Sequence, residues 1–154
     1  MIIRKAEFKD IPALARLLHQ VNDVHADGRP DIFIHGQRKY TDEELKEVLS
    51  HSACPVFVAD NGGEVLGYAF CQLEDIRRHN LRPEKTLYID DICVDEAARG
   101  QGVGSRLYDY VNQYAADEGC RRITLNVWCL NPGAMEFYKK MGMEPLKITM
   151  EKIL

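Results

Sequence analysis

The stretch from Tyr88 to Tyr110, YIDDICVDEAARGQGVGSRLYDY, constrains the fold of this chain more than any other. An apolar run that ends at Val94 is followed by a glycine-rich loop. The apolar residues after the loop recur at spacings of three, four and seven: Val103, Leu107, Tyr110, Val111 and Tyr114. Such spacings place residues on one face of a helix. The stretch therefore predicts a strand that leads through a glycine loop into the N-terminus of a helix.

The glycine loop has the chemistry of an anion site. The first turn of a helix carries unpaired N–H groups and a partial positive charge, and glycines let a ligand approach the backbone closely. Arg99 adds a permanent positive charge, so we predict a phosphate-binding loop. Its glycines are spaced G-x-G-x-G, which matches neither the P-loop nor the dinucleotide pattern. We therefore do not expect ATP or NAD as ligands.

A family resemblance narrows the choice of phosphate ligand. The pattern Arg99-x-x-Gly102-x-Gly104, which follows LYIDDICV, resembles the Q/R-x-x-G-x-G/A acetyl-CoA signature of the GNAT superfamily of N-acetyltransferases. The likeness continues in the opening strand and helix and in the later segment NVWCLNPGAMEFYKKMGM, so it covers nearly the whole chain. It implies an α/β fold with a mixed, mostly antiparallel central sheet, splayed central strands and about four flanking helices.

The resemblance also implies acetyl-CoA as co-substrate and assigns residues to it. Members of the superfamily hold the pantetheine against a splayed strand, at positions that Ile92, Cys93 and Val94 occupy here, and the Val94 N–H would face the thioester oxygen. The residues expected at the remainder of the cofactor are Arg99, Gly100, Gln101, Gly102, Val103, Gly104, Ser105 and Asn131. Asn131 is also a good helix N-cap, which by itself would explain the residue.

Tyr138 is the candidate general acid. It lies where members of the superfamily commonly carry the tyrosine that protonates the leaving thiolate. A phenol of pKa ~10 can protonate a thiolate of pKa ~8.5 only in a concerted step or when its own pKa is perturbed. Without the resemblance, Tyr138 beside Phe137 would be interpreted as an ordinary core aromatic.

Asp90 and Asp91 are the candidate acids for deprotonating an amine. Aspartate is depleted in strands, and adjacent strand residues point to opposite faces, so we expect at most one of them on the substrate side. The string YIDDICV resembles the Y-[IL]-E-D-x-x-V of polyamine acetyltransferases, in which the first acid lies beside the amine. That position is Asp90, one methylene shorter, which favours a water relay. A solvated strand start, or a pair with an arginine, is the structural alternative.

Length and composition indicate one domain over residues 1–154. No apolar run approaches the ~20 residues of a membrane span, and the N-terminus lacks a signal-peptide pattern, so we expect a cytoplasmic protein. The five cysteines are scattered, without zinc spacing, and we expect no metal. The net charge of −4, without basic clusters, argues against nucleic acid and would suit a cationic substrate.

The remaining elements follow from local signals. We expect a strand over 1–6, an Asp10-capped helix ending near Asp23, a capping box of Thr41 and Glu44, and helices ending at Gly119 and over 132–141. Further strands are expected over 55–59, 64–73, 86–94, 122–129 and 144–150. The long loop 24–40 holds candidates for acceptor recognition: His25, Asp27, Asp31, His35 and Tyr40.

The function expected from these residues is direct acetyl transfer from acetyl-CoA to a primary amine in a ternary complex. A small cationic amine such as a polyamine and a protein amine are both open as acceptors. The alternatives are an acyl-CoA sensor without turnover and a nucleotide phosphate binder. Homodimers are common in the family, so the resemblance also allows a homodimer, and neither a membrane nor a nucleic acid is expected as a partner.

Overall fold

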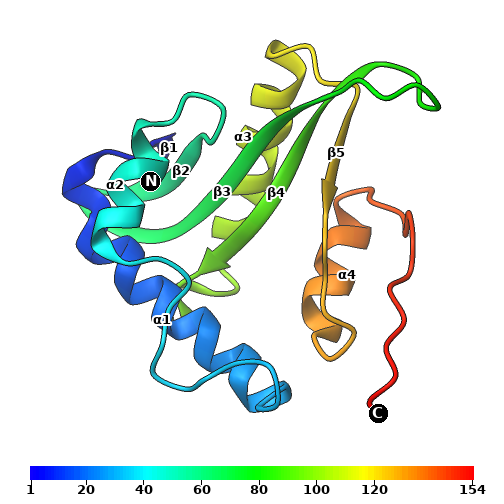
Figure 1. Ribbon diagram of the computed structural model, residues 1–154. Helices are drawn as coiled ribbons and strands as arrows, with labels where there is room; N and C mark the ends of the chain where they lie inside the picture. Colours follow the sequence, from blue (N-terminus) through cyan, green and yellow to red (C-terminus); the bar gives the residue numbers. More distant parts are fainter.

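A computed structural model describes residues 1–154 and shows a five-stranded sheet with helices on both faces (Figure 1). The strands lie in the order β1 to β5: Ile2–Lys5, Val56–Asn61, Glu64–Ile76, Glu84–Val94 and Arg122–Leu125. The helices are α1 (Ile11–Gly28), α2 (Asp42–Ser50), α3 (Val103–Asp117) and α4 (Pro132–Lys140), with 3₁₀ turns at Phe8–Asp10 and Glu96–Ala98. Neighbouring strands are antiparallel except β4 and β5, which are parallel. The predicted mixed, mostly antiparallel α/β fold with four helices is confirmed.

The sheet has a hydrophobic core on each face. On one face, α1 and α2 cover a cluster that includes Leu14, Leu45 and Tyr68. On the other, α3 packs Leu107 and Val111 against residues of β2, β3 and β4, and α4 adds partly buried aromatics. Alternate residues of a strand point to opposite faces, so each central strand contributes to both cores. β3 and β4 are consequently fixed on both sides.

Several predicted boundaries are confirmed. Thr41 and Glu44 form the capping box of α2, and Asn131 caps α4 with Pro132 in its first turn. Helix α3 begins at Val103, after Gly102 in a left-handed conformation (φ 77°). Gly119 and Gly142, which follow α3 and α4, also have positive φ, as expected for residues that end helices.

The first helix differs from its prediction at both ends. It continues to Gly28 rather than stopping near Asp23, because Ala26 is fully buried and extends the apolar stripe by another turn. Asp10 occupies the N-cap position but makes no side-chain cap. Its carboxylate instead accepts hydrogen bonds from the Arg4 guanidinium and the Glu7 N–H.

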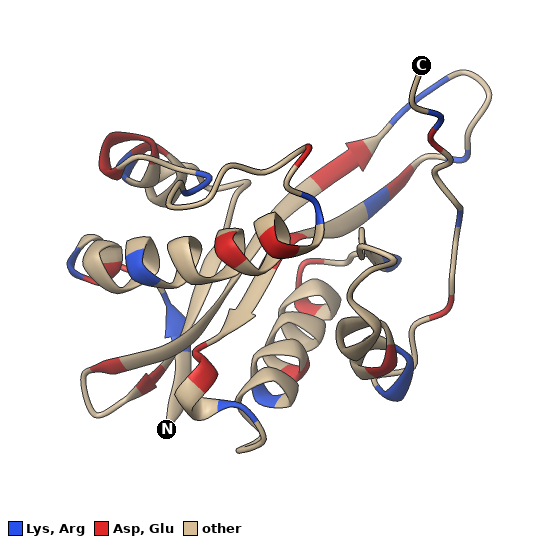
Figure 2. Cartoon of the chain, turned by 90° about the horizontal axis from the view of Figure 1, so that it is seen from below, with Lys and Arg blue, Asp and Glu red and all other residues tan.

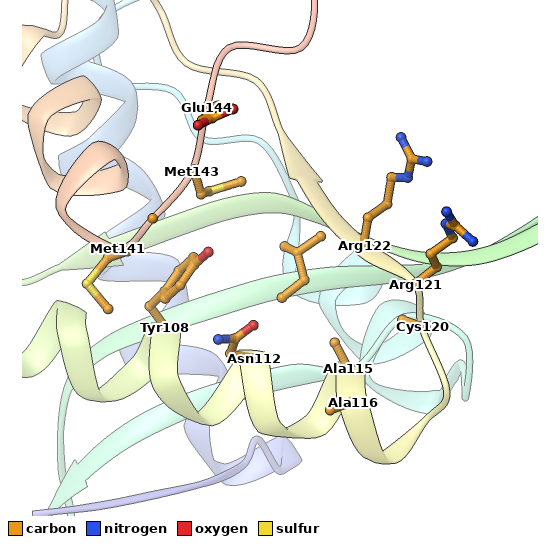
Figure 3. Close-up of a pocket in the computed structure, with 12 residues that line it drawn as sticks. Tyr108, Asn112, Ala115, Ala116, Cys120, Arg121, Arg122, Met141, Met143 and Glu144 are labelled. Atoms are coloured by element: carbon orange, nitrogen blue, oxygen red, sulfur yellow. The ribbon is translucent and has the colours of Figure 1, made fainter.

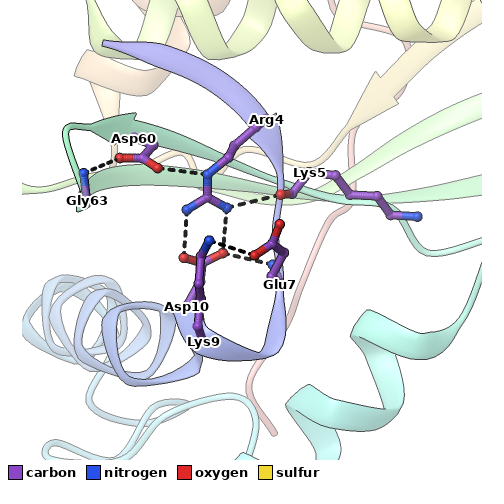
Figure 4. A network of polar contacts seen from close by, with 7 residues as sticks. All are labelled: Arg4, Lys5, Glu7, Lys9, Asp10, Asp60 and Gly63. Atoms are coloured by element: carbon purple, nitrogen blue, oxygen red, sulfur yellow. Dashed lines mark hydrogen bonds and ion pairs between the residues drawn. The ribbon is translucent and has the colours of Figure 1, made fainter.

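The Asp10 carboxylate belongs to a polar network that joins three parts of the fold (Figure 4). Arg4 in β1 contacts both oxygens of Asp10 at 2.7 and 2.8 Å, and its Nε donates to Asp60 in β2 at 2.8 Å. Asp60 also accepts from the Gly63 N–H in the β2–β3 turn. Asp10 is only 4% exposed. Elsewhere acidic and basic residues are intermixed along the elements (Figure 2).

Two predicted strands are wrong in part or in whole. β5 stops at Leu125 rather than Cys129, because its ladder with β4 ends at the Ile89–Leu125 pair. The segment 144–150 forms no strand, although its residues alternate as a strand would. No neighbouring strand pairs with it, and Leu146, Ile148 and Met150 are exposed. None of the helices has the length and apolar character needed to cross a membrane.

Candidate active site

Strand β4 contains one extra residue at the centre of the candidate site. Phe70 of β3 lies opposite Asp91, whereas the next residue, Cys71, lies opposite Ile89, so Asp90 has no partner in the ladder. Such an extra residue is a β-bulge, which bends a strand and shifts its alternation by one. Before the bulge Leu87 and Ile89 face the α3 core, and after it Ile92 and Val94 do.

The bulge places both acids on the α1 face of the sheet. Asp90 accepts a hydrogen bond from Tyr40, and Asp91 accepts one from Tyr68; both tyrosines belong to the cluster beneath α1 and α2. The prediction that neighbouring strand residues must point to opposite faces is therefore wrong at this position. The prediction assumed a regular strand, in which neighbouring side chains alternate between the two faces, and the extra residue of the bulge interrupts this alternation.

Beyond the bulge, one edge of β4 is unpaired. β5 accompanies β4 only as far as Ile89, so residues 90–94 have a neighbour on the β3 side alone, and the two strands diverge there (Figure 1). The Asp95 N–H donates to the Leu66 carbonyl, one step beyond the Gly67–Val94 pair. In an antiparallel ladder this pattern turns the N–H and C=O of Val94 and Ile92 away from β3. The N–H and C=O of Ile92 and the N–H of Val94 are therefore available to an extended ligand along the edge, whereas the Val94 carbonyl accepts a hydrogen bond from Arg99.

Cys93 differs from its two neighbours. By the same alternation its backbone groups bond β3, opposite Tyr68. Its side chain is buried and its Sγ lies 3.9 Å from the Leu17 carbonyl oxygen. Neither the backbone groups nor the side chain of Cys93 are accessible to a ligand at the open edge. The prediction that Cys93 contacts the cofactor is therefore wrong.

The glycine loop leads directly from this edge into α3. Gly100 and Gly102 have left-handed φ of 74° and 77°, and a Cβ on either would meet no atom within 4 Å. No side chain caps α3, and its first internal hydrogen bond of the backbone runs from the Arg106 N–H to the Gly102 carbonyl. The N–H groups that precede Arg106 in the first turn therefore have no side-chain cap and no acceptor within the helix, as in an anion site.

The side chains of the loop divide into two groups. Val103 is buried in the α3 core, so only its N–H can serve a ligand. Gln101 donates to the Ala97 carbonyl, and the exposed Arg99 donates from Nε to the Val94 carbonyl at 3.4 Å. Arg99 thus lies between the β4 edge and the α3 N-terminus, with the outer nitrogens of its guanidinium available for a phosphate.

Tyr138 lies on the α3 side of the same edge. Its ring is half-buried and packs against Phe137 and Tyr108, with centroids 5.2 and 6.5 Å away. A Cβ on Gly104 would lie 3.6 Å from the Phe137 ring and 3.5 Å from Val94, so α4, α3 and β4 converge here. Burial, reinforced by the negative charge of Asp91, raises the pKa of Tyr138 far above that of a free phenol.

Asp90 forms an ion pair with a lysine of the same chain. The Lys39 Nζ lies 2.6 Å from Asp90 Oδ2, and the Tyr40 hydroxyl lies 3.1 Å from the same oxygen. The Asp90 side chain is 13% exposed and that of Lys39 is 47% exposed. The sequence analysis considered an arginine as the ion-pair partner of Asp90, and the structure shows that the partner is Lys39. The Lys39 ammonium occupies the place beside Asp90 that the ammonium of an amine substrate would need.

Asp91 lies deeper and has different partners. Burial raises the pKa of its carboxyl, while the Tyr68 hydroxyl, 2.6 Å away, lowers it. The Tyr68 hydroxyl belongs to a fully buried side chain. Burial wins in the balance, so Asp91 binds a proton more readily than an ordinary aspartate.

A small aromatic cavity lies close enough to Asp91 for the charge of that acid to act on His25 in its lining. His25, Phe33, Trp128 and Asn131 line it together with Arg29, and its volume is about 110 Å³. The His25 ring centroid lies 5.0 Å from Phe33 and 6.3 Å from Trp128. Burial lowers the pKa of His25, while the charge of Asp91 opposes this shift, so His25 favours the neutral form.

The other candidates from the loop 24–40 are placed outside this cavity. His35 lies between Asp23 and Asp27, at 3.5 and 3.2 Å, on an exposed surface. Asp31 forms an ion pair with Arg29. No group of three or more His, Cys, Asp or Glu side chains is arranged as metal ligands would be.

Four residues of the site were missed in the sequence: Lys39, Tyr68, Phe33 and Trp128. Tyr68 could have been found, because it shares a strand face with Phe70 in the segment 64–73. Lys39 and Phe33 lie in an irregular segment without a periodic signal, and Trp128 lies in the part of the predicted strand 122–129 that the structure shows as irregular, so only the fold brings these residues together.

Comparison with known proteins agrees with this geometry. The profile of the Acetyltransferase (GNAT) family matches residues 18–143. The chain belongs to the GNAT acetyltransferase family. The GNAT match includes the bulged strand, the glycine loop and Tyr138.

Individual GNAT relatives are moderately similar. The chain is 34% identical over 146 residues to the thialysine N-epsilon-acetyltransferase of Mus musculus, which covers 95% of this chain and 76% of the mouse protein. It is 29% identical over 118 residues to the uncharacterized N-acetyltransferase MJ1207 of Methanocaldococcus jannaschii, 77% of this chain. The match spans about half (51%) of that archaeal protein and 36% of the bovine thialysine acetyltransferase.

A solved structure has nearly the same fold. The tetramutant of the BH1408 protein from Bacillus halodurans superposes with a TM-score of 0.95 at 31% identity, over 100% of both chains. The GNAT fold is thus shared from end to end with that protein.

Proposed function

We propose that this chain is an acetyl-CoA-dependent N-acetyltransferase that passes the acetyl group directly to a primary amine bound beside Asp90. One observation carries the proposal. The unpaired edge of β4 connects the α3 N-terminus at one end with two adjacent carboxylates at the other. A phosphate-bearing thioester and a cationic amine therefore have complementary places on a single strand.

The donor side of the site would be formed mainly by backbone groups. The N–H groups at the start of α3, together with Arg99, would bind the pyrophosphate. The free N–H and C=O of Ile92 would pair with the amides of the extended pantetheine, and the free N–H of Val94 would donate to the thioester oxygen. Acetyl-CoA supplies the activated acetyl group. Asn131, with its Oδ1 engaged by the Ala134 N–H, keeps an amide N–H₂ for the same ligand.

The acceptor side would be formed by the acids and the aromatic cavity. An alkylammonium has a pKa of ~10.4 and must lose a proton before it attacks. Asp90 is the acid closest to the open edge and would accept this proton directly or through a water molecule. Asp91, whose raised pKa favours proton binding, would provide a second position for it.

Tyr138 would donate the proton that the leaving thiolate needs. Its raised pKa keeps the phenol protonated, but it also makes the phenol a weaker acid than usual. Proton transfer must therefore accompany cleavage of the C–S bond rather than precede it. The position of Tyr138, where α3, α4 and β4 converge, supports this role.

The acceptor class proposed is a small cationic amine. A cavity of about 110 Å³ lined by His25, Phe33 and Trp128 suits an alkyl amine, and the two carboxylates suit its charge. Two of the relatives, from Bos taurus and Mus musculus, are named thialysine N-epsilon-acetyltransferases, and thialysine is a small amino acid derivative with an amine side chain. A lysine or N-terminus of a protein is the second acceptor class.

The test is thiol release from acetyl-CoA by the purified chain, with spermidine, diamines, lysine, thialysine, aminoglycosides and short peptides as acceptors. Amine-dependent release would establish the reaction and identify the acceptor class. Binding of acetyl-CoA by calorimetry, without release for any amine, would instead favour an acyl-CoA sensor. A thermal shift with ATP but none with CoA would contradict the assignment of the glycine loop.

A further inference from the structure

An arginine of α1 reaches the junction between β4 and the glycine loop. Arg16 forms an ion pair with Asp95, the residue that directly follows β4, and its second nitrogen, Nη2, donates to the Val65 carbonyl at 3.3 Å. The Asp95 side chain is only 17% exposed, so its carboxylate depends on partners within the protein. The ion pair therefore connects a helix on one face of the sheet to the loop that begins α3 on the other face.

All polar groups of Asp95 have a partner. The Asp95 N–H donates to the Leu66 carbonyl at 2.8 Å, and the Asp95 carbonyl accepts from the Ala98 N–H at 2.9 Å. Its Oδ1 accepts from the Ala97 N–H at 3.1 Å and so caps the 3₁₀ turn after β4. Its Oδ2 accepts from Arg16. Removal of Arg16 would therefore leave one oxygen of a largely shielded carboxylate without a partner.

Arg99 is the arginine closest to Asp95 along the chain, four positions later, and it has no ion-pair partner. Its guanidinium donates only from Nε, to the Val94 carbonyl at 3.4 Å. The two charges nevertheless act on each other. The pKa of Asp95 is lowered first by the hydrogen bond from Arg16, and the charge of Arg99 adds to this lowering. Because a carboxylate and a phosphate bind the forked guanidinium in the same way, an unpaired Asp95 would compete with a phosphate for Arg99.

The arginines at another hollow of the molecule show the result of such a competition. A cavity of about 420 Å³ lies between the C-terminal half of α3, the start of β5 and residues 141–144, with Arg121 and Arg122 at its border (Figure 3). Both arginines contact the Glu84 carboxylate, at 3.6 and 2.9 Å. An acid of the same chain thus takes up their charge, which makes them poor ligands for an anion.

We propose that Arg16 is a positioning residue for the cofactor: by binding Asp95 it prevents that carboxylate from pairing with Arg99, and so keeps Arg99 free for the pyrophosphate of CoA. The inference rests on the proposed function, which assigns Arg99 and the glycine loop to acetyl-CoA. In this role Arg16 acts through Asp95 and does not itself bind the cofactor. Its loss would raise the KM for acetyl-CoA and leave kcat at saturating acetyl-CoA unchanged.

Calorimetry of CoA binding to three variants tests the inference. Arg16→Met should weaken the affinity about tenfold, as expected when one charge-assisted hydrogen bond to a phosphate is lost. Asp95→Asn should bind CoA at least as tightly as the unmodified chain, because an asparagine still caps the 3₁₀ turn but has no charge with which to hold Arg99. The double variant Arg16→Met/Asp95→Asn should therefore recover the affinity. Neither damage to α1 nor loss of a direct contact between Arg16 and CoA would be repaired in this way.

Three further variants separate the role of Arg16 from general effects of charge. Arg16→Lys retains a cation beside Asp95 and should keep most of the affinity. Arg77→Met removes an equal charge and another ion pair with an aspartate, that of Arg77 with Asp75, and should leave CoA binding unchanged. In an Arg99→Met background, Arg16→Met should have no additional effect, because the residue that it protects is absent.

The inference is wrong if Arg16→Met binds CoA normally, if the double variant binds as weakly as Arg16→Met, or if Arg16→Met weakens binding equally with and without Arg99. Each of these results would mean that Asp95 does not compete for Arg99. Failure of the proposed function would look different, since the unmodified chain would then bind no CoA before any variant is compared.

Discussion

Tyr138 retains its proton throughout the physiological pH range, because burial and the Asp91 charge raise its pKa. We predict that Tyr138→Phe lowers kcat by about 10²–10⁴-fold, the usual contribution of a general acid. Affinity for acetyl-CoA should hardly change, since the phenol is assigned to the leaving group only. Single-turnover kinetics with calorimetry would measure both. Tyr108→Phe, in the same aromatic cluster, is the control, and equal effects of the two variants would remove Tyr138 from the acid role.

Lys39 occupies the position beside Asp90 where the acceptor ammonium is expected. An incoming cation must displace it, so Lys39→Met should lower the KM for a cationic amine a few-fold, on the order of 1 kcal/mol for a partly exposed pair. Steady-state kinetics would show this with kcat almost unchanged. Lys46→Met on the exposed face of α2 changes the net charge equally and should have no such effect. A higher KM for Lys39→Met would mean that Lys39 itself binds the acceptor.

At the scale of elements, the glycine loop works through the conformation of Gly102. A Cβ at this position meets no protein atom within 4 Å, but its left-handed φ of 77° strains any other residue by about 1–2 kcal/mol. Gly102→Val should therefore weaken CoA binding at least about tenfold, because its side chain projects where a phosphate must approach. Calorimetry would measure the affinity.

Gly62→Val is the matched control for that substitution. Gly62 has a φ of 68° and open space around it, in the β2–β3 turn far from α3 in the sequence. It should lose comparable thermal stability and keep its CoA affinity. Unaltered affinity in Gly102→Val would contradict the assignment of the loop.

The elements that the sequence predicted well are those with local signals. The α2 capping box, the Gly102–Val103 boundary and the Asn131–Pro132 start of α4 depend on residues within one helical turn of each other. The predicted end of β5 and the predicted strand over 144–150 were wrong, because a strand forms only beside a neighbouring strand and an alternating sequence does not reveal whether one is present.

The candidate site shows the same division. The glycine loop, Asp90 and Tyr138 were proposed as site residues from motifs. The face of the sheet on which Asp91 lies could not be predicted, because it depends on the extra residue that β4 contains relative to β3, a strand some twenty residues earlier in the chain. Lys39 reaches Asp90 across 51 positions of sequence. Such contacts have no local pattern and appear only when the chain is folded.

At the scale of the molecule, the Arg4–Asp10–Asp60 network ties β1, the start of α1 and the β2–β3 turn together. Asp10→Asn leaves a largely buried arginine with one carboxylate and should cost about 3 kcal/mol of unfolding free energy at pH 7. The pKa of Asp10 is lowered by Arg4. Its contribution is therefore complete above the ordinary aspartate pKa of ~3.9 and is lost as the pH falls through the lowered value.

Urea unfolding between pH 7 and pH 2 would test this dependence. The difference between the unmodified chain and Asp10→Asn should shrink as the pH falls toward 2. Asp75→Asn, at a highly exposed ion pair with Arg77, should change stability by less than about 0.5 kcal/mol at any pH. A difference for Asp10→Asn that stays constant down to pH 2 would show that the charge of Asp10 is not what stabilises the fold.

The bulge at Asp90 depends on the number of residues in β4 rather than on the identity of any side chain. If Asp90 were deleted, Ile89 and Ile92 would still face the α3 core, and Asp91 and Cys93 would still face α1, because the alternation would become regular. Both cores would keep their residues, whereas the bend that opens the β4 edge would be lost. We therefore expect that deletion of Asp90 would preserve the fold and abolish the proposed site. In this protein a single additional residue separates a regular sheet from one with a bent, open edge, a difference that no exchange of one amino acid for another could reproduce.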